Sequence, residues 1–290
     1  MSVLSLKYPS LKLGYDALSS LYDNLGRWQG SVLHMEEALI AGCSKQVAID
    51  GHVVGTCPAE NDLAEKGYQV IKMGEPQLNL LMSYDVNTGA PLLSRIYSGA
   101  MSDKVSVRGL MGEAGRGGML FIVDGGLCST ENLKIFSSNG NSYIIPLAKD
   151  LTICRKAVEN LDLKDRFAYQ KGRKGTVVEY KDEIIVDNRV ITYRDLSESV
   201  LKQTNYLRHM EQGNCSYTQE NFEKLRDFMG ITVLQTSFKA GDKTAQEIYV
   251  LYKKDGPLKR STTTLRIKQI TGHFTCRITT RRRGWPSSCW

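Results

Sequence analysis

The sequence lacks several features that would assign the chain to a special class. No stretch approaches the roughly 18 to 20 consecutive apolar residues of a membrane span, and the first 30 residues do not resemble a secretory signal. The seven cysteines are scattered and never spaced C-x-x-C, and the four histidines lack metal-ligand spacing. We therefore expect a cytoplasmic protein with no membrane segment, no disulfide framework and no zinc knuckle.

Acidic residues are absent from the end of the chain. The whole sequence carries 38 Lys and Arg against 31 Asp and Glu, a net charge of +7. Residues 256–290 contain eight Lys or Arg and no acid, so residues 1–255 hold 30 basic against 31 acidic residues, a balance of −1. The basic character, which is typical of proteins that bind polyanions, belongs wholly to this C-terminal segment.

The hydrophobic pattern from residue 46 onward predicts alternating strands and helices. Short apolar or β-branched runs predict strands over 47–54, 77–84, 92–97, 119–123 and 143–147. Helices are expected over 102–114, and from a cap at Ser129 or Thr130 to about 138. Three strands, a helix, a strand, a helix and a strand is the order of an RNase H-like α/β fold, a mixed sheet flanked by helices.

These patterns divide the chain into five expected segments. They are a helical lead-in (1–45), the RNase H-like core (46–150), a β-rich and helical insertion (151–238), the start of the last helix (239–254) and a C-terminal tail (255–290). Within the insertion, we expect strands over 176–193 with a turn at Asp187-Asn188, helices over 195–212 and 218–229, and a strand over 230–238.

Two aspartates stand out because the expected strand order brings them together. Asp50 lies in the first strand and Asp124 follows the fourth, and these two strands are neighbours in this fold. A carboxylate at the end of a buried strand is costly to desolvate unless a partner such as a divalent cation compensates it. Each Asp-Gly alone is more often a turn residue, but the joint placement predicts a site for Mg²⁺.

Three stretches, residues 47–54, 91–103 and 121–133, resemble the DDE transposases of bacterial insertion sequences. The resemblance extends over about residues 45–254. It implies that Asp50 and Asp124 are the catalytic metal ligands of a two-metal site that uses Mg²⁺ or Mn²⁺.

The same resemblance implies further roles and one departure. Gly99 and Asp103 should support the turn from the third strand into the following helix. The family often has Arg where this chain has Gly125, which puts one DNA or phosphate contact in doubt.

The family's third acid is missing. It lies on a helix with the pattern Tyr, two residues, Arg, three residues, Glu, six residues, Lys. Tyr252 begins this pattern, but Asp255-Gly256-Pro257 breaks the helix and no acid follows. Glu247 is a weak substitute, for which a solvated helix face is the simpler interpretation.

The missing motif can be read in another frame. If the codons from Lys254 through Arg266 are read two bases later, codon degeneracy permits Arg, Glu and Lys at the family's spacing from Tyr252. We therefore predict that residues 255–290 are an out-of-frame product. The alternative is a functional tail, in which Arg281-Arg282-Arg283 with Trp285 and Trp290 binds nucleic acid by phosphate neutralisation and stacking.

The sequence thus predicts a transposase that cuts and joins DNA at transposon ends, defective in this copy. DNA is the expected partner, in a homodimer or a mixed dimer with intact transposase, associated with the nucleoid in the bacterial cytoplasm. Two alternatives stay open: a non-catalytic DNA-binding or regulatory derivative, and an RNase H-fold nuclease. The chain is short for the family and begins close to the core, so we expect no specific recognition of transposon ends.

Overall fold

The computed structural model describes residues 20, 24, 28–55, 63–66, 76–114, 117–159, 161–171, 174–213 and 216–254. The chain forms two compact units, Met1–Cys43 and Ser44–Trp290. The described part of the first unit contains α3 (Gln29–Ala41), in the segment where we expected a helical lead-in. The predicted out-of-frame tail, 255–290, lies outside the described residues.

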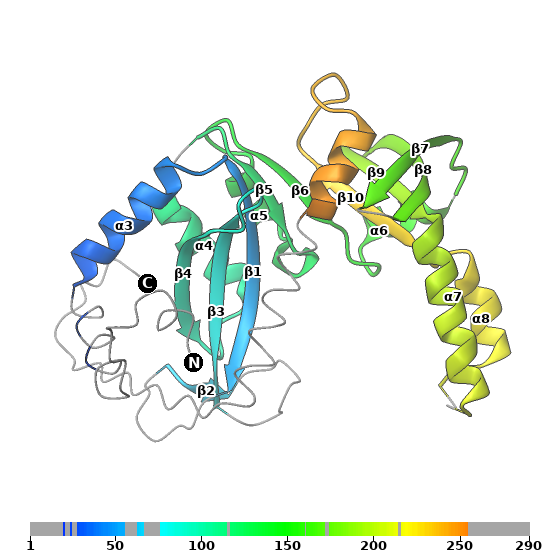
Figure 1. The fold of residues 1–290 in the computed structure, drawn as a ribbon, viewed down its shortest axis with the longest axis horizontal. Coiled ribbons are helices and arrows are strands. Elements are labelled where there is room, and N and C mark those ends of the chain that lie inside the picture. The colour runs from blue at the N-terminus through cyan, green and yellow to red at the C-terminus, as the bar shows by residue number, and fades with distance from the viewer. Residues whose placement is uncertain are drawn as a thin grey trace. The chain divides into compact units, whose positions relative to one another are not determined.

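The second unit begins with the strands of the core. They are β1 (Gln46–Gly55), β2 (Glu65–Lys66), β3 (Pro76–Asp85), β4 (Pro91–Ser98), β5 (Leu120–Val123) and β6 (Ser142–Pro146). β4 pairs with β3, and β3 pairs with β1, both antiparallel, whereas β1–β5 and β5–β6 are parallel. The spatial order β4-β3-β1-β5-β6 is that of the RNase H-like core (Figure 1), so the predicted fold class is confirmed.

A helix precedes each of the parallel strands β5 and β6, as is usual for crossover connections. α4 (Asp103–Ala114) leads into β5, and α5 (Thr130–Phe136) leads into β6. The hydroxyl of Ser129 caps α5 by accepting a hydrogen bond from the backbone N–H of Asn132 at 3.1 Å, which satisfies one of the free donors at the helix start. α4 packs on β3 and β4, and α5 packs on β6.

The insertion extends the core sheet. Its elements are α6 (Thr152–Glu159), β7 (Asp165–Lys171), β8 (Lys174–Ile185), β9 (Asn188–Asp195), α7 (Leu196–Glu211), α8 (Gln219–Arg226) and β10 (Ile231–Thr236). β10 pairs antiparallel with both β6 and β9, so the sheet continues as β6-β10-β9-β8-β7. The hairpin turn is centred on Val186 and Asp187, both with positive φ, one residue before the predicted position.

The last described helix covers residues 245–254 and is the unlabelled orange helix in Figure 1. Thr244 and Glu247 form a capping box at its start. The Thr244 hydroxyl accepts from the Glu247 N–H at 3.2 Å, and the Glu247 carboxylate accepts from the Thr244 N–H at 2.8 Å. The predicted helix is therefore present and begins with a defined N-cap.

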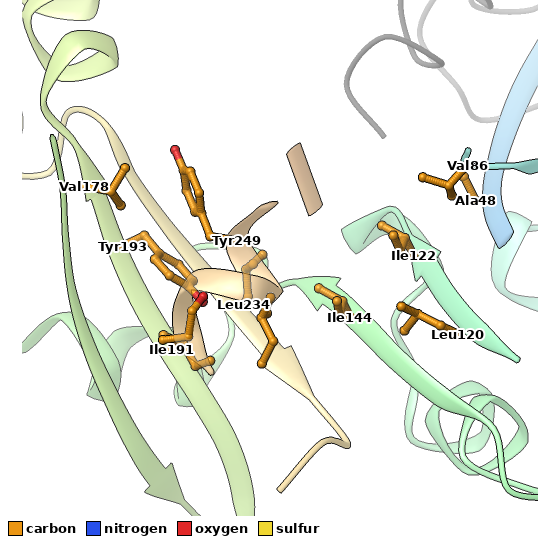
Figure 2. Packing of buried hydrophobic residues seen from close by; sticks show 12 residues of the cluster. Ala48, Val86, Leu120, Ile122, Ile144, Val178, Ile191, Tyr193, Leu234 and Tyr249 are labelled. Atoms are coloured by element: carbon orange, nitrogen blue, oxygen red, sulfur yellow. The ribbon is translucent and has the colours of Figure 1, made fainter. Parts of the chain in front are cut away.

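One hydrophobic cluster joins the core, the insertion and this helix. Figure 2 shows its two sides, with one group of side chains on the core strands and the other on the insertion and the last helix. Ala245, Ile248 and Tyr249 contribute from the helix, and each is almost completely buried. Burial of this apolar surface holds the helix on one face of the extended sheet.

None of the described helices has the length and hydrophobicity required to cross a membrane.

Candidate active site

The parallel pairing of β1 and β5 places Asp50 beside Asp124. Ile49 is the registered partner of Val123, and each aspartate is the next residue along its chain. The backbone at Asp124 is still extended, with φ −75° and ψ 151°. Because neighbouring strands lie about 4.8 Å apart, the backbone positions that bear the two carboxylates are adjacent.

Both aspartates face the side of the sheet that the last helix covers. Ala48 and Ile122 are registered partners and belong to the hydrophobic cluster that contains Tyr249 (Figure 2). Asp50 lies two residues further along β1, and Asp124 lies two residues after Ile122 with an extended backbone. Side chains at this spacing point to the same face. The carboxylates therefore lie at the margin of the cluster that holds the helix.

The surroundings of Asp50 are partly apolar. Asp50 is half-buried, Asp124 is exposed, and Met82 lies opposite Asp50 on β3. Burial and the negative charge of Asp50 raise the pKa of the nearby Tyr84 hydroxyl. The Tyr84 hydroxyl therefore stays protonated and neutral near neutral pH.

The turn that follows Asp124 is fixed by a buried amide. The Asp124 carbonyl accepts from the Leu127 N–H at 3.0 Å. The fully buried Asn132 side chain donates to the carbonyls of Leu127 and Lys104, both at 2.9 Å. Asn132 thus ties the turn to the start of α4. The sequence analysis missed this role, although Asn132 lies in the 121–133 stretch that resembles the family.

Gly125 and Gly99 are both required by close backbone approaches. A Cβ atom at Gly125 would lie 2.7 Å from the Pro146 carbonyl oxygen of the neighbouring strand. A Cβ atom at Gly99 would overlap the carbonyl of Gln77. The arginine that the family often has at the first of these positions therefore does not fit this backbone without a shift of β6.

The Glu247 carboxylate is hydrogen-bonded at the start of the last helix. It accepts from both the N–H and the hydroxyl of Thr244, at 2.8 Å each, and these hydrogen bonds hold its pKa below the usual range. Among the described residues, no three His, Cys, Asp or Glu side chains form a group that could hold a metal. Glu247 therefore does not complete a cage with Asp50 and Asp124.

Tyr252, the first residue of the family motif, lies half-buried on the last helix against the same cluster. The motif places the third acid seven residues later, about 10 Å further along a continuous helix. That position falls after residue 254, outside the described residues.

The oxygen ligands that Asp50 and Asp124 offer are of the type that a hard divalent cation prefers. Carboxylate oxygens are the ligands that Mg²⁺ and Mn²⁺ prefer, and Asp50 with Asp124 supplies two carboxylates from adjacent strands. Two carboxylates alone would leave most coordination positions of such a cation to water.

The strand order defines an RNase H-like α/β fold. The family model described as "Transposase DDE domain" matches residues 41–254. The chain therefore belongs to the DDE transposase family.

Comparison with solved structures gives a similar chain in the cryo-EM structure of a piggyBac transposase synaptic complex with hairpin DNA. The TM-score is 0.45 and the sequence identity 11%, and the match covers 91% of this chain and 54% of that chain. This chain thus spans about half the length of that transposase. No curated protein matches the sequence.

Proposed function

We propose that this chain derives from an insertion-sequence transposase that cleaves and joins DNA at transposon ends, and that this copy is catalytically defective. The observation that carries the proposal is that Asp50 and Asp124 directly follow Ile49 and Val123, which are paired on the adjacent parallel strands β1 and β5. The preceding pair, Ala48 and Ile122, belongs to the cluster that packs the helix on which the family bears its third acid. The family match ends at residue 254, directly before the sequence that departs from the motif.

In the proposed site, Asp50 and Asp124 hold Mg²⁺ or Mn²⁺ through their carboxylates. The bound ions would supply activation of the attacking hydroxyl and stabilisation of the leaving oxygen. The chain's own residues set the geometry for this. β1 and β5 fix the separation of the two aspartates, and Asn132 holds the turn after Asp124. Without a third acid we expect weak metal binding and strand cleavage reduced by orders of magnitude.

The frame hypothesis is tested by the nucleotide sequence that encodes Tyr249 to Trp290. We expect the second frame to spell Arg, three residues, Glu, six residues and Lys at the family's spacing from Tyr252. A second frame that lacks this motif would show that the tail is genuine and that the proposed loss of the third acid is wrong.

The activity is tested with a frame-restored chain, in which the second frame follows Lys254. We expect it to cut a labelled duplex containing the DNA that flanks the coding region, in Mg²⁺ or Mn²⁺, and to join the product to target DNA. The variants Asp50→Asn and Asp124→Asn should lose this activity, whereas the chain as it exists should show little. Nicking without joining would favour an RNase H-fold nuclease instead.

A second candidate is a non-catalytic DNA-binding or regulatory derivative, acting alone or in a mixed dimer with intact transposase. Two observations favour it: the described residues lack a three-acid group, and the sequence after residue 255 is basic. Binding of the existing chain to duplex DNA should then weaken steeply with salt, because counterion release scales with phosphate contacts. Removal of residues 256–290 should abolish that salt dependence if the tail is responsible. Such a protein would act at the nucleoid in the bacterial cytoplasm.

A further inference from the structure

Polar side chains from the insertion contact the last helix, and the loop before it, at successive points. Four of them lie on β9 and the first turn of α7 and are called the anchor residues: Arg189, Tyr193, Asp195 and Glu198. Nothing in the family motif involves these positions, and they lie more than 60 residues after Asp124 in the sequence.

Arg189 anchors the loop before the helix. Its side chain is almost fully buried, and its Nη1 donates to the carbonyls of Phe238, Lys239 and Lys243 at 3.3, 2.9 and 2.8 Å. Its Nε and Nη2 donate to the Asp182 carboxylate at 3.0 and 2.6 Å. One guanidinium thus contacts three backbone carbonyls and a carboxylate at once through its rigid, planar set of donors.

Tyr193 anchors the first helical turn. Its buried hydroxyl donates to the Ala245 carbonyl at 2.8 Å, and its ring lies 5.0 Å from the ring of Tyr249, centroid to centroid. The contact holds both the start of the helix and the aromatic side chain one turn later.

Asp195 anchors the second turn while it caps α7. One carboxylate oxygen accepts from the Tyr249 hydroxyl at 2.9 Å. The other accepts from the Thr176 hydroxyl at 2.9 Å and from the Glu198 N–H at 3.1 Å. Burial alone would raise the pKa of Asp195, but these hydrogen bonds outweigh it and hold the pKa below the usual range. The group is therefore an ionised acceptor at neutral pH.

Glu198 anchors the third turn. Its carboxylate pairs with Lys253 at 3.1 Å and with Lys202 at 2.9 Å. The Lys253 ammonium also lies 5.2 Å from the centre of the Tyr249 ring, within the range of a cation–π contact.

These contacts follow the same order along both segments. Residues 189, 193, 195 and 198 bind residues 238–243, 245, 249 and 253. An apolar cluster excludes water but tolerates sliding, whereas directional hydrogen bonds set one register. We infer that the anchor residues are positioning residues for the third metal ligand of the frame-restored chain, because they fix the axial register and rotation of the helix, residues 245–254, that leads to its position. This inference rests on the proposed function.

The geometry makes register critical. A slip of one residue moves a helical side chain by about 1.5 Å along the axis and turns it by about 100°. A misplacement of about 1 Å at a reacting centre can reduce the rate roughly 100-fold. The insertion would thus serve as the fixed support from which the helix reaches the two aspartates.

The first test uses the chain as it exists and compares two Tyr→Phe variants by hydrogen exchange. Tyr249→Phe removes the hydroxyl that binds Asp195 and keeps the ring. Tyr206→Phe is the matched control, because the buried Tyr206 bonds through its hydroxyl to Thr218, away from the last helix. We expect amides 248–254 to exchange at least tenfold faster in Tyr249→Phe only, with β1 and β5 unchanged in both. Equal protection in the two variants would overturn the anchoring.

The second test measures Mn²⁺ affinity in the frame-restored chain, a property that a merely structural contact would not change. Tyr249→Phe and Glu198→Gln should each raise the Kd about tenfold, and Tyr206→Phe should leave it unchanged. If the parent binds Mn²⁺ through Asp50 and Asp124 but these variants bind equally well, the positioning role alone is refuted. If the parent shows no binding that depends on the two aspartates, the proposed function fails, and this inference with it.

Discussion

At the scale of single residues, Asp85 shows how one buried carboxylate fixes the start of the aspartate-bearing strand. It is 1% exposed, and one of its oxygens accepts from the N–H groups of Asn87 and Thr88, both at 2.9 Å. The other accepts from the Ser44 N–H, two residues before β1. Burial would raise the pKa of Asp85, but these hydrogen bonds outweigh it and lower the pKa. The side chain therefore joins the turn after β3 to the entrance of β1.

This depressed pKa predicts a pH dependence. Because the folded-state pKa lies below the unfolded value of about 3.9, the ionised group contributes stability that is present above pH 4 and is lost as the pH falls through the folded-state pKa. Asp85→Asn should lower the free energy of unfolding by about 1–3 kcal/mol at pH 7. The difference from the parent should shrink below about pH 4.

Urea unfolding at pH 7, 5 and 3 measures this difference. Asp162→Asn is a suitable control, because Asp162 forms an exposed pair with Lys164 at 2.7 Å, and such pairs contribute little. A difference between Asp85→Asn and the parent that is constant from pH 7 to pH 3 would contradict the assignment.

At the scale of elements, the turn between β5 and α5 decides where Asp124 points. Gly125 packs against the Pro146 carbonyl, whereas a Cβ atom at Gly126 would meet nothing within 4 Å. Neither glycine has a positive φ. The two positions therefore differ in the room available for a side chain, and a side chain at either would not strain the backbone through a positive φ.

The two glycines therefore predict opposite responses to alanine. Gly125→Ala should destabilise the protein by about 1–3 kcal/mol, because the added methyl group displaces the backbone of β6. Gly126→Ala should change stability by less than about 0.5 kcal/mol. Thermal unfolding of the two variants measures the contrast, and equal melting temperatures would show that the turn adapts freely.

The elements that carry the aspartates were predictable from sequence because their patterns are local. β1 and β5 are runs of apolar and β-branched residues, with Asp50-Gly51 inside β1 and Asp124-Gly125 directly after β5, and this signal needs no tertiary information. β7 was missed because its sequence, DRFAYQK, mixes charged and aromatic residues, as suits the last strand in the sheet order. α6, with the sequence TICRKAVE, was also missed.

The candidate site was predictable only in part, because local sequence patterns do not encode contacts between distant residues. Asp50 and Asp124 follow from strand order, but the contacts that support them are distant in sequence. Asn132 bonds to Lys104 across 28 residues, and Asp195 bonds to Tyr249 across 54. No periodicity or local motif encodes such pairs, so these positioning roles appear only once the chain is folded.

At the scale of the whole molecule, metal binding and folding stability are coupled. A ligand that binds the folded state alone stabilises it by RT ln(1 + [L]/Kd). With three acids and a Kd of about 1 mM, 10 mM Mn²⁺ would add about 1.4 kcal/mol to the free energy of unfolding. With the two acids that the described residues bring together, the same concentration should add much less.

The frame-restored chain should therefore gain about 1.4 kcal/mol in 10 mM Mn²⁺, while the existing chain gains less than about 0.5 kcal/mol. Denaturant unfolding with and without the metal measures both gains. Asp50→Asn or Asp124→Asn should remove the gain from the frame-restored chain, and Asp162→Asn should not. An equal gain in the two parent chains would mean that the cation binds elsewhere. A gain confined to the frame-restored chain would assign its metal site to the two aspartates together with the helix that the insertion anchors.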